Sequence, residues 1–286
     1  MFALSDDDCT GTILGCGDGP ASFNAEATQR GHRVVSCDPL YRFDAQTIQS
    51  RVEATYVRIM DETQRNADDF VWNAIPSPEA LGALRLQAMQ EFLKDYESGK
   101  THGRYVDAEL PTLPFGPASF DLVVCSHLLF LYSTQLTHDF HLAALDELCR
   151  VAGEVRVFPL VALSGMPSPY IEPVRIHLAA QGLEVSIEKV AYEFRRGADQ
   201  MMRIRHRSIR RAAPLGEGNI AARRMSYAPD RAHDASGVSG VMSSPRQRCG
   251  LDLGDHHRQS RHGLSCVWQR GIWKSRRDSE KNVVEA

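Results

Sequence analysis

A cluster of glycines near the start of the chain is the first feature whose spacing suggests chemistry. Gly15, Gly17 and Gly19 lie between a short apolar run and a helical pattern, with Asp18 inside the cluster. Glycines here let the backbone approach a ligand closely, and the helix that follows attracts an anionic group to its N-terminus. Asp38 comes nineteen residues after Gly19, at the end of the next apolar run, where a carboxylate can accept hydrogen bonds from both hydroxyls of a ribose. The set predicts an adenosine-cofactor site; the alternative is a tight turn and an aspartate that caps a helix.

The spacing of the glycines bears on which adenosine cofactor would fit. Dinucleotide-binding turns read Gly-x-Gly-x-x-Gly, so Gly15 and Gly17 would require a glycine at position 20, where the chain has Pro20. Asp107, followed by Ala108, ends the third predicted strand, where an acidic side chain could bind an adenine amino group. These features argue against NAD and leave other adenosine cofactors open.

The elements that must position these residues alternate between strands and helices. Strands are predicted at residues 12–14, 33–37, 103–107, 120–125, 154–163, 183–194 and 201–206. Helices are predicted at residues 21–30, 134–151 and about 171–181. This alternation is typical of an α/β domain with a mostly parallel sheet. Only a short link separates the last two strands, so we expect them to pair antiparallel.

A long segment after the second strand interrupts this alternation. Asp38 and Tyr105 are separated by 66 residues, far more than an ordinary crossover needs. Apolar residues at helical spacing, and a Ser77-Pro78 pair suited to a helix start, predict a helical insertion at about residues 44–100. It is either a layer that covers the sheet or a cap over a substrate pocket.

The order of these features resembles the class I S-adenosylmethionine-dependent methyltransferases. The resemblance covers about residues 12–207. It is carried by ILGCGDGPASF, GHRVVSCDP, YVDAELPTLPFGPASFDLVV, the helix ending in ELCRVAGEVRVFPL, and the closing hairpin. It implies a Rossmann-like sheet, mostly parallel with a C-terminal antiparallel hairpin, and S-adenosylmethionine as cofactor. Segments such as DPLYRF and SHLLFLYS look similar to an uncharacterised bacterial subgroup, so the resemblance supplies no acceptor.

The resemblance assigns roles to the glycine cluster, with one departure. The family's first strand commonly ends in an acid, any residue, glycine, any residue and glycine. Gly17 and Gly19 match the two glycines, whereas Gly15 stands in place of the acid, which orders the loop and approaches the methionine amino group. Asp18 or a backbone carbonyl would have to substitute for it.

The same resemblance assigns roles at the ends of three later strands. Asp38 matches the acid that binds the ribose. Asp107, with Ala108 beside it, matches the acid that contacts adenine. Ser126 and His127 fall where the fourth strand opens onto the cofactor.

The chemistry that the resemblance implies asks little of the protein beyond positioning. S-adenosylmethionine carries a sulfonium leaving group, so the protein must hold a nucleophile in line with the methyl group. A general base helps only where the acceptor arrives protonated. His127, which titrates near neutrality, is the candidate base; alternatively it lines the pocket or packs under a helix.

Charge and motif content narrow the acceptor. Residues 1–208 carry a net charge of −9, without the basic stripe that binding to a phosphate backbone needs. No Asn-Pro-Pro-Tyr or Asp-Pro-Pro-Tyr sequence, which marks methylation of adenine or glutamine amino groups, follows the fourth strand. We therefore expect a small-molecule acceptor and argue against nucleic acid for residues 1–208.

Composition points to a reduced compartment. The seven cysteines include no Cys-x-x-Cys pair, and four of them lie in apolar segments, which indicates buried thiols in a cytoplasmic protein. No apolar run approaches the roughly 20 residues that a membrane-spanning helix needs, and no secretory signal is visible.

The last part of the chain differs from the rest. Residues 209–286 carry a net charge of +6 and show no apolar periodicity, so we expect a disordered basic tail after a domain of residues 1–208. Its histidines and cysteines match no established zinc spacing. The arginines, with Trp268 and Trp273, could bind RNA or an acidic surface, or the tail could be an accidental extension.

Three functions remain open at this point. The first is methyl transfer from S-adenosylmethionine to an unidentified acceptor. The second, suggested by Gly15, is a protein that keeps the cofactor site without transfer. The third, disfavoured by Pro20 and the terminal hairpin, is an NAD-dependent oxidoreductase.

Overall fold

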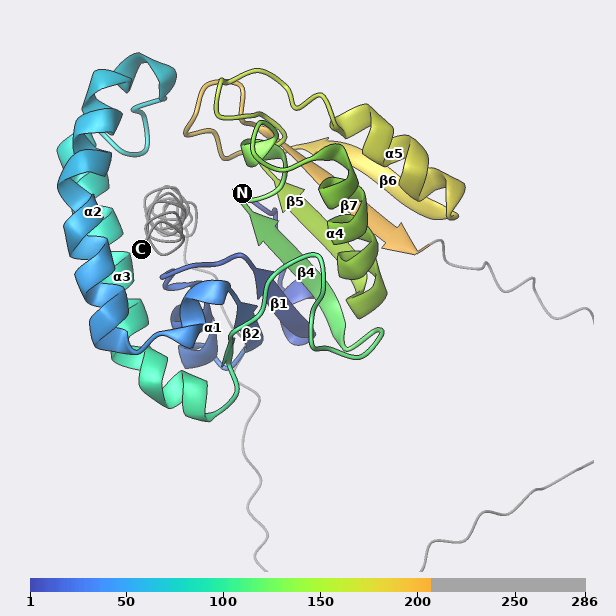
Figure 1. Ribbon diagram of the computed structural model, residues 1–286, viewed down its shortest axis with the longest axis horizontal. Helices are drawn as coiled ribbons and strands as arrows, with labels where there is room; N and C mark the ends of the chain where they lie inside the picture. Colours follow the sequence, from blue (N-terminus) through green and yellow to red (C-terminus); the bar gives the residue numbers. More distant parts are fainter. Residues whose placement is uncertain (207–286) are drawn as a thin grey trace, which may run out of the picture. The chain divides into compact units, whose positions relative to one another are not determined.

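The computed structural model describes residues 1–206, so the expectations for the tail lie outside the described residues. Those residues form a seven-stranded sheet in the order β3-β2-β1-β4-β5-β7-β6 (Figure 1). The strands are β1 (Thr12–Cys16), β2 (Arg33–Cys37), β3 (Tyr105–Val106), β4 (Phe120–Ser126), β5 (Ala152–Phe158), β6 (Leu183–Lys189) and β7 (Gln200–His206). The first five are parallel, and β7 runs antiparallel to both β5 and β6. This confirms the predicted class: an α/β fold with a mostly parallel, Rossmann-like sheet and a C-terminal antiparallel hairpin.

Five α-helices accompany the sheet within the described residues: α1 (Phe23–Gln29), α2 (Ala45–Arg65), α3 (Pro78–Thr101), α4 (His138–Val151) and α5 (Ile171–Ala180). Helices α4 and α5 cover one face (Figure 1), where Leu148 and Val174 join a core with Val123, Val155 and Ile204. On the opposite face, α1 and the N-terminal residues contribute Ala27 and Phe2 to a second core. Because both faces are covered, β1, β2, β4 and β5 are rich in apolar residues along their length.

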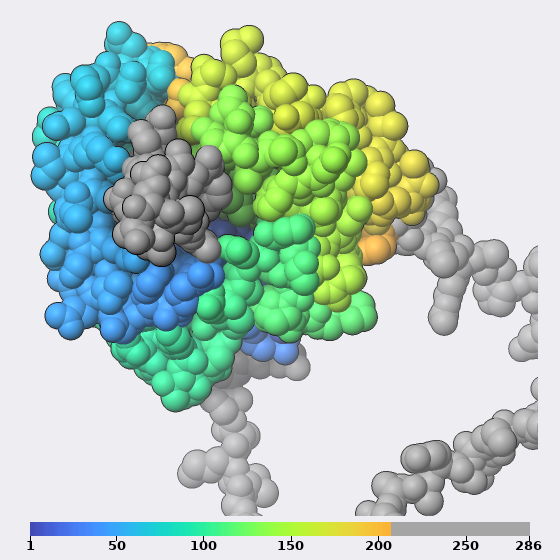
Figure 2. Space-filling model, in the orientation of Figure 1, coloured from blue at the N-terminus to red at the C-terminus, as the bar shows by residue number. Residues whose placement is uncertain are grey.

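The segment between β2 and β3 is a pair of long helices packed side by side (Figure 1). Asp44 caps α2 by accepting a hydrogen bond from the Thr47 amide at 2.7 Å, and Ser77 caps α3 through the Ala80 amide at 3.2 Å. Figure 2 shows, in the same orientation, the outer surface of α2 in blue and that of α4 in green.

A cluster of aromatic rings joins this helical pair to the sheet. Tyr41, Phe92, Tyr96 and Tyr105 are all buried, with ring centroids 4.9–6.0 Å apart. The Tyr96 hydroxyl also donates to the Tyr41 and Phe43 carbonyls, at 2.9 and 2.8 Å. Through Tyr41 the helical pair is fixed to the chain that follows β2.

β3 ends one residue earlier than predicted, at Val106, and two further strands end well before the ends of their apolar runs. β6 ends at Lys189, not at residue 194, because Phe194 turns away to pack against Phe70 and Trp72 between α2 and α3. The Val71 amide donates to the Phe194 carbonyl at 2.7 Å. β5 ends at Phe158 rather than residue 163 because the next residue is Pro159, which has no N–H for the ladder.

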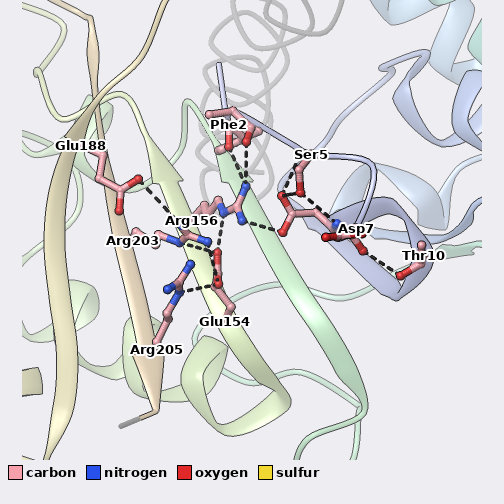
Figure 3. A network of polar contacts seen from close by, with 11 residues as sticks. Phe2, Ser5, Asp7, Thr10, Glu154, Arg156, Glu188, Arg203 and Arg205 are labelled. Atoms are coloured by element: carbon pink, nitrogen blue, oxygen red, sulfur yellow. Dashed lines mark hydrogen bonds and ion pairs between the residues drawn. The ribbon is translucent and has the colours of Figure 1, made fainter. Parts of the chain in front are cut away.

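The N-terminal residues are tied to β5 by a buried arginine. Arg156 is 1% exposed and donates to the Phe2 and Ala3 carbonyls and to Asp8 (Figure 3). It also pairs with Glu154, which in turn pairs with Arg203 and Arg205 of β7.

Within residues 1–206, no helix is both long and apolar enough to cross a membrane.

Candidate functional site

The glycine loop leaves β1 at Cys16 and is fixed to β2 by its own backbone. Gly17 and Gly19 have φ values of 70° and 58°, in the left-handed region that favours glycine. The Gly17 amide donates to the Cys37 carbonyl at 2.9 Å. The Tyr41 hydroxyl donates to the Gly19 carbonyl at 2.7 Å. The loop is therefore held in one conformation by the end of β2 and the residues after it.

Asp38 lies at the carboxyl end of β2 and faces the same loop. One carboxylate oxygen accepts from the Gly19 amide at 2.9 Å, and the other accepts from the Leu40 amide at 2.7 Å. The second bond caps the short 3-10 helix η2 (Pro39–Arg42). Asp38 therefore does cap a helix, as the alternative interpretation of this residue predicted. A carboxylate offers about four acceptor positions, and such a group at the end of a strand is suited to accept hydrogen bonds from the hydroxyls of a ribose.

Asp18 is turned inward beneath the loop. Its carboxyl accepts a hydrogen bond from the Ser36 hydroxyl of β2 at 2.6 Å and is 7% exposed. A Cβ atom on Gly15 would overlap the Asp18 carboxyl, whose Cγ would lie 2.6 Å from it. Burial, and to a lesser extent the charge of Asp38, raise the pKa of Asp18 to about 7. The Asp18 carboxyl thus lies beside the end of β1, where Gly15 has no side chain.

Asp107 and Ala108 follow β3 on the next strand outward. The Asp107 carboxylate pairs with Arg42 of η2 at 3.3 Å, and both side chains are about two-fifths exposed. Ala108 packs partly buried against the core beneath α4. An adenine amino group that binds Asp107 would have to share this carboxylate with the Arg42 guanidinium.

Ser126 and His127 lie at the carboxyl end of β4. The Ser126 hydroxyl and His127 Nδ1 are 2.7 Å apart, and the His127 amide donates to the Phe158 carbonyl at 2.6 Å. His127 has a φ of 53°, unusual for a non-glycine residue and a form of strain that occurs at functional sites. Burial, together with the positive charges of the N-terminus and Arg85, lowers the pKa of His127 to about 3. The imidazole is therefore neutral at neutral pH.

The strand register brings these separate segments together. Cys16 of β1 is directly opposite Cys37 of β2 and Cys125 of β4, so the residues that follow all emerge at one edge of the sheet. In α/β sheets, ligands bind outside the carboxyl ends of the strands, where the order of strands reverses, as it does around β1 and β4 here. Cys16, Cys37 and Cys125 are buried and carry free thiols. No group of three or more possible metal ligands occurs in the described part of the chain.

Three residues that support this site were not predicted from the sequence. Ser36 supports Asp18, Tyr41 supports Gly19, and Arg42 pairs with Asp107. Ser36 could have been found as a polar residue within an otherwise apolar strand. Tyr41 and Arg42 follow Asp38 closely in the sequence. Their spacing does not predict that Tyr41 contacts the glycine loop or that Arg42 contacts Asp107.

The sheet and the position of this site define the class of the fold, a Rossmann-like α/β fold with an antiparallel closing hairpin. No family model matches the chain. An uncharacterized protein of Methanocaldococcus jannaschii is 28% identical over 207 residues, which are 72% of this chain and 90% of that protein.

Among solved structures, the magnesium protoporphyrin IX methyltransferase of Synechocystis PCC 6803 with bound SAH is similar at 12% identity and a TM-score of 0.40. The match covers 70% of this chain and 76% of that one. A possible histamine N-methyltransferase of Thermotoga maritima is similar at 12% identity and a TM-score of 0.36. This second match covers 68% of this chain and 82% of the Thermotoga maritima chain.

Proposed function

We propose that the chain is an S-adenosylmethionine-dependent methyltransferase that acts on a small-molecule acceptor. The observation that carries the proposal is the Asp38 carboxylate at the end of β2, bonded to the Gly19 amide of the glycine loop. A carboxylate that is buried and hydrogen-bonded to the amide of a left-handed glycine is suited to bind a ribose placed over the end of the sheet.

The residues present fit this cofactor. Asp38 would hold the ribose, Asp107 the adenine amino group, and the backbone of Gly17 and Gly19 would allow the cofactor to lie close to the loop. Asp18 adds a second carboxyl near the loop, which favours a ligand that carries positive charge. The cofactor supplies an activated methyl group through its sulfonium.

The chain's own contribution is to bind and orient the two reactants. His127 lies at the end of β4 as a neutral imidazole, hydrogen-bonded to Ser126. A neutral imidazole can accept a hydrogen bond from an acceptor hydroxyl or amine and so orient it. A pKa of about 3 makes His127 a weak base, so we propose orientation rather than proton removal as its main role.

The charge of the chain favours a small acceptor over a nucleic acid, because residues 1–208 carry a net charge of −9. The alternative of a binder without transfer was suggested by the missing acid at position 15. The Asp18 carboxyl that lies beside Gly15 weakens that suggestion.

Ligand binding tests the cofactor. Calorimetry should detect S-adenosylmethionine and S-adenosylhomocysteine and no comparable binding of NAD; tight NAD binding alone would overturn the proposal. A screen for transfer of labelled methyl groups from S-adenosylmethionine into small-molecule fractions of a cell extract tests turnover. Label that never leaves the cofactor in any fraction would favour the binder without transfer.

A substitution tests the site itself. Asp38→Ala should lower the affinity for S-adenosylhomocysteine at least tenfold, because hydrogen bonds to a charged acceptor contribute ~1.5–3 kcal/mol each and ~1.4 kcal/mol is a factor of ten. Asp139→Asn, at an exposed carboxylate on α4, is the matched control and should bind as the parent does. If Asp38→Ala folds and binds as tightly as the parent, the site is wrongly placed.

A further inference from the structure

Asp18 takes no part in the methyl-transfer step itself, yet the fold makes room for its carboxyl beside the cofactor loop. A side chain at position 15 would collide with Asp18, because its Cβ would lie 2.6 Å from the Asp18 Cγ and 2.7 Å from the Oδ1, and this position is a glycine. Ser36 donates to the carboxyl at 2.6 Å, and Asn24 of α1 donates to Ser36 at 3.2 Å. The strand, the loop and α1 together define a seat for this side chain.

The surroundings of the seat are unfavourable for a negative charge. Asp18 is buried and close enough to Asp38 for the two carboxylates to repel. The Tyr41 and Tyr105 hydroxyls also interact with it, and both are neutral at physiological pH because burial raises their pKa values. The cationic Arg104 donates to Asn24 at 2.7 Å and so lies two hydrogen bonds beyond Ser36. Ser36 and Asn24 add neutral dipoles. The Ser36 hydroxyl favours the ionised carboxyl, whereas burial and the charge of Asp38 oppose it, and burial is the largest of these effects.

A positive charge brought to the loop would reverse this balance. Asp18 stands between Gly17 and Gly19, the residues that a cofactor in the proposed site would approach most closely. In a site of low effective dielectric constant, a cation bound near a carboxyl favours its ionised form. S-adenosylmethionine carries positive charge on its sulfonium and its ammonium group, whereas adenosine carries none.

We propose that Asp18 couples cofactor binding to proton release: the carboxyl holds a proton in the free protein and gives it up to solvent when a cationic cofactor binds. One O–H bond is broken, the electron pair stays on the Asp18 carboxylate, and buffer takes the proton. The inference rests on the proposed function, since it takes S-adenosylmethionine as the ligand of this loop. Its consequence is that affinity for a cationic cofactor depends on pH near neutrality, whereas affinity for adenosine does not.

Calorimetry of the full chain in two buffers of different ionisation enthalpy measures the protons released. At pH 7 the parent should release roughly half a proton more per S-adenosylmethionine than Asp18→Asn does, since a group that titrates near 7 is half protonated there. Asparagine keeps an oxygen for the Ser36 hydroxyl, and titration of the ligand itself cancels between the two proteins. Asp139→Asn should release as many protons as the parent. Equal release by the parent and Asp18→Asn would overturn the proposal.

A second measurement needs no variant. The affinity of the parent for S-adenosylmethionine, divided by its affinity for adenosine, should rise as pH increases from about 5.5 to 7 and level off above, by up to ~10-fold per pH unit at the acid end. A ratio that changes no more than the ligand's own titration requires would overturn the proton coupling and leave the proposed function intact. Failure of the parent to bind either compound would overturn the proposed function, and this inference with it.

Discussion

At the scale of single residues, positions 15 and 18 are dependent on each other. Gly15 is not among the glycines with positive φ, so its backbone would tolerate a side chain. What excludes a side chain is the Asp18 carboxyl, which lies where the Cβ would be. The glycine at position 15 and the aspartate three residues later therefore form one structural unit.

A double-mutant cycle tests this dependence. Gly15→Ala should destabilise the chain by ~1–3 kcal/mol, because the new methyl group collides with a buried carboxyl that has little room to move. In an Asp18→Gly background the same substitution should cost less than ~0.5 kcal/mol, giving a coupling well above the error of additivity. Urea unfolding of the four proteins gives the free energies. An equal cost of Gly15→Ala in both backgrounds would contradict the arrangement.

The protonation of Asp18 also has a consequence for stability. The folded chain holds this proton to about pH 7, whereas an unfolded aspartate loses it near 3.8. The folded state therefore binds more protons between those values, so the stabilisation is fully present below about pH 3.8 and is lost as pH rises through about 7.

Asp18→Asn removes this proton and allows a direct comparison. The difference in unfolding free energy between the parent and Asp18→Asn should fall as pH rises from 5 to 7, by at most ~1.4 kcal/mol per unit. Using the difference cancels Asp8, Asp44 and Asp121, whose pKa values hydrogen bonding lowers and which titrate in acid. A difference that is flat across this range would show that Asp18 is ionised in the folded chain.

At the scale of elements, the helices α2 and α3 support the site indirectly, through Tyr41. Tyr41 connects the two: its ring lies in the aromatic cluster with Phe92, and its hydroxyl holds the Gly19 carbonyl. Phe92 belongs to α3 and is connected to the glycine loop through Tyr41. Because it packs on Tyr41, we expect the packing of this cluster to influence the conformation of the loop.

Phe92→Ala tests this connection. The ring is fully buried, so its loss should cost ~3–5 kcal/mol of stability and also weaken S-adenosylhomocysteine binding by loosening Tyr41. Val57→Ala, at an exposed position of α2, should change stability by less than ~0.5 kcal/mol. Thermal unfolding and calorimetry on the same samples would measure both effects. If stability falls but affinity in the remaining folded protein does not, the helical pair does not act on the loop.

At the scale of the whole molecule, the part of the chain that the structure describes, residues 1–206, contains a sheet of seven paired strands. The last of them, β7, is held by β5 on one side and β6 on the other. Arg203 and Arg205 of β7 also pair with Glu154 of β5, which secures this end of the sheet.

A shortened chain tests the predicted boundary. A chain that ends at residue 208 should fold, melt within a few degrees of the full chain, and bind S-adenosylhomocysteine with the same affinity, because every strand pair of the sheet is retained. Differential scanning calorimetry and ligand titration of both chains would show this. Aggregation of the shortened chain, or a markedly lower melting temperature, would mean that residues after 208 belong to the folded unit.

Local sequence patterns determined most of the elements and the positions of the site residues. The strand at 33–37 was predicted at its observed bounds, because apolar β-branched residues there are stopped by Asp38-Pro39. The antiparallel pairing of β6 and β7 followed from the short link between them. Gly17, Gly19, Asp38, Asp107 and Ser126 emerge at strand ends because parallel strands in a doubly wound sheet all end at the same edge.

What only the tertiary structure decided depends on contacts between distant parts of the chain. The apolar run 183–194 stops being a strand at Lys189, and Phe194 at its end packs against Phe70 and Trp72 from the segment between α2 and α3. Asp107 pairs with Arg42, 65 residues away, and His127 is neutral because of burial that no local pattern encodes. The sequence placed Asp18 in the glycine loop. That its carboxyl lies over Gly15, bonded to Ser36, follows only from the packing of β1 beside β2.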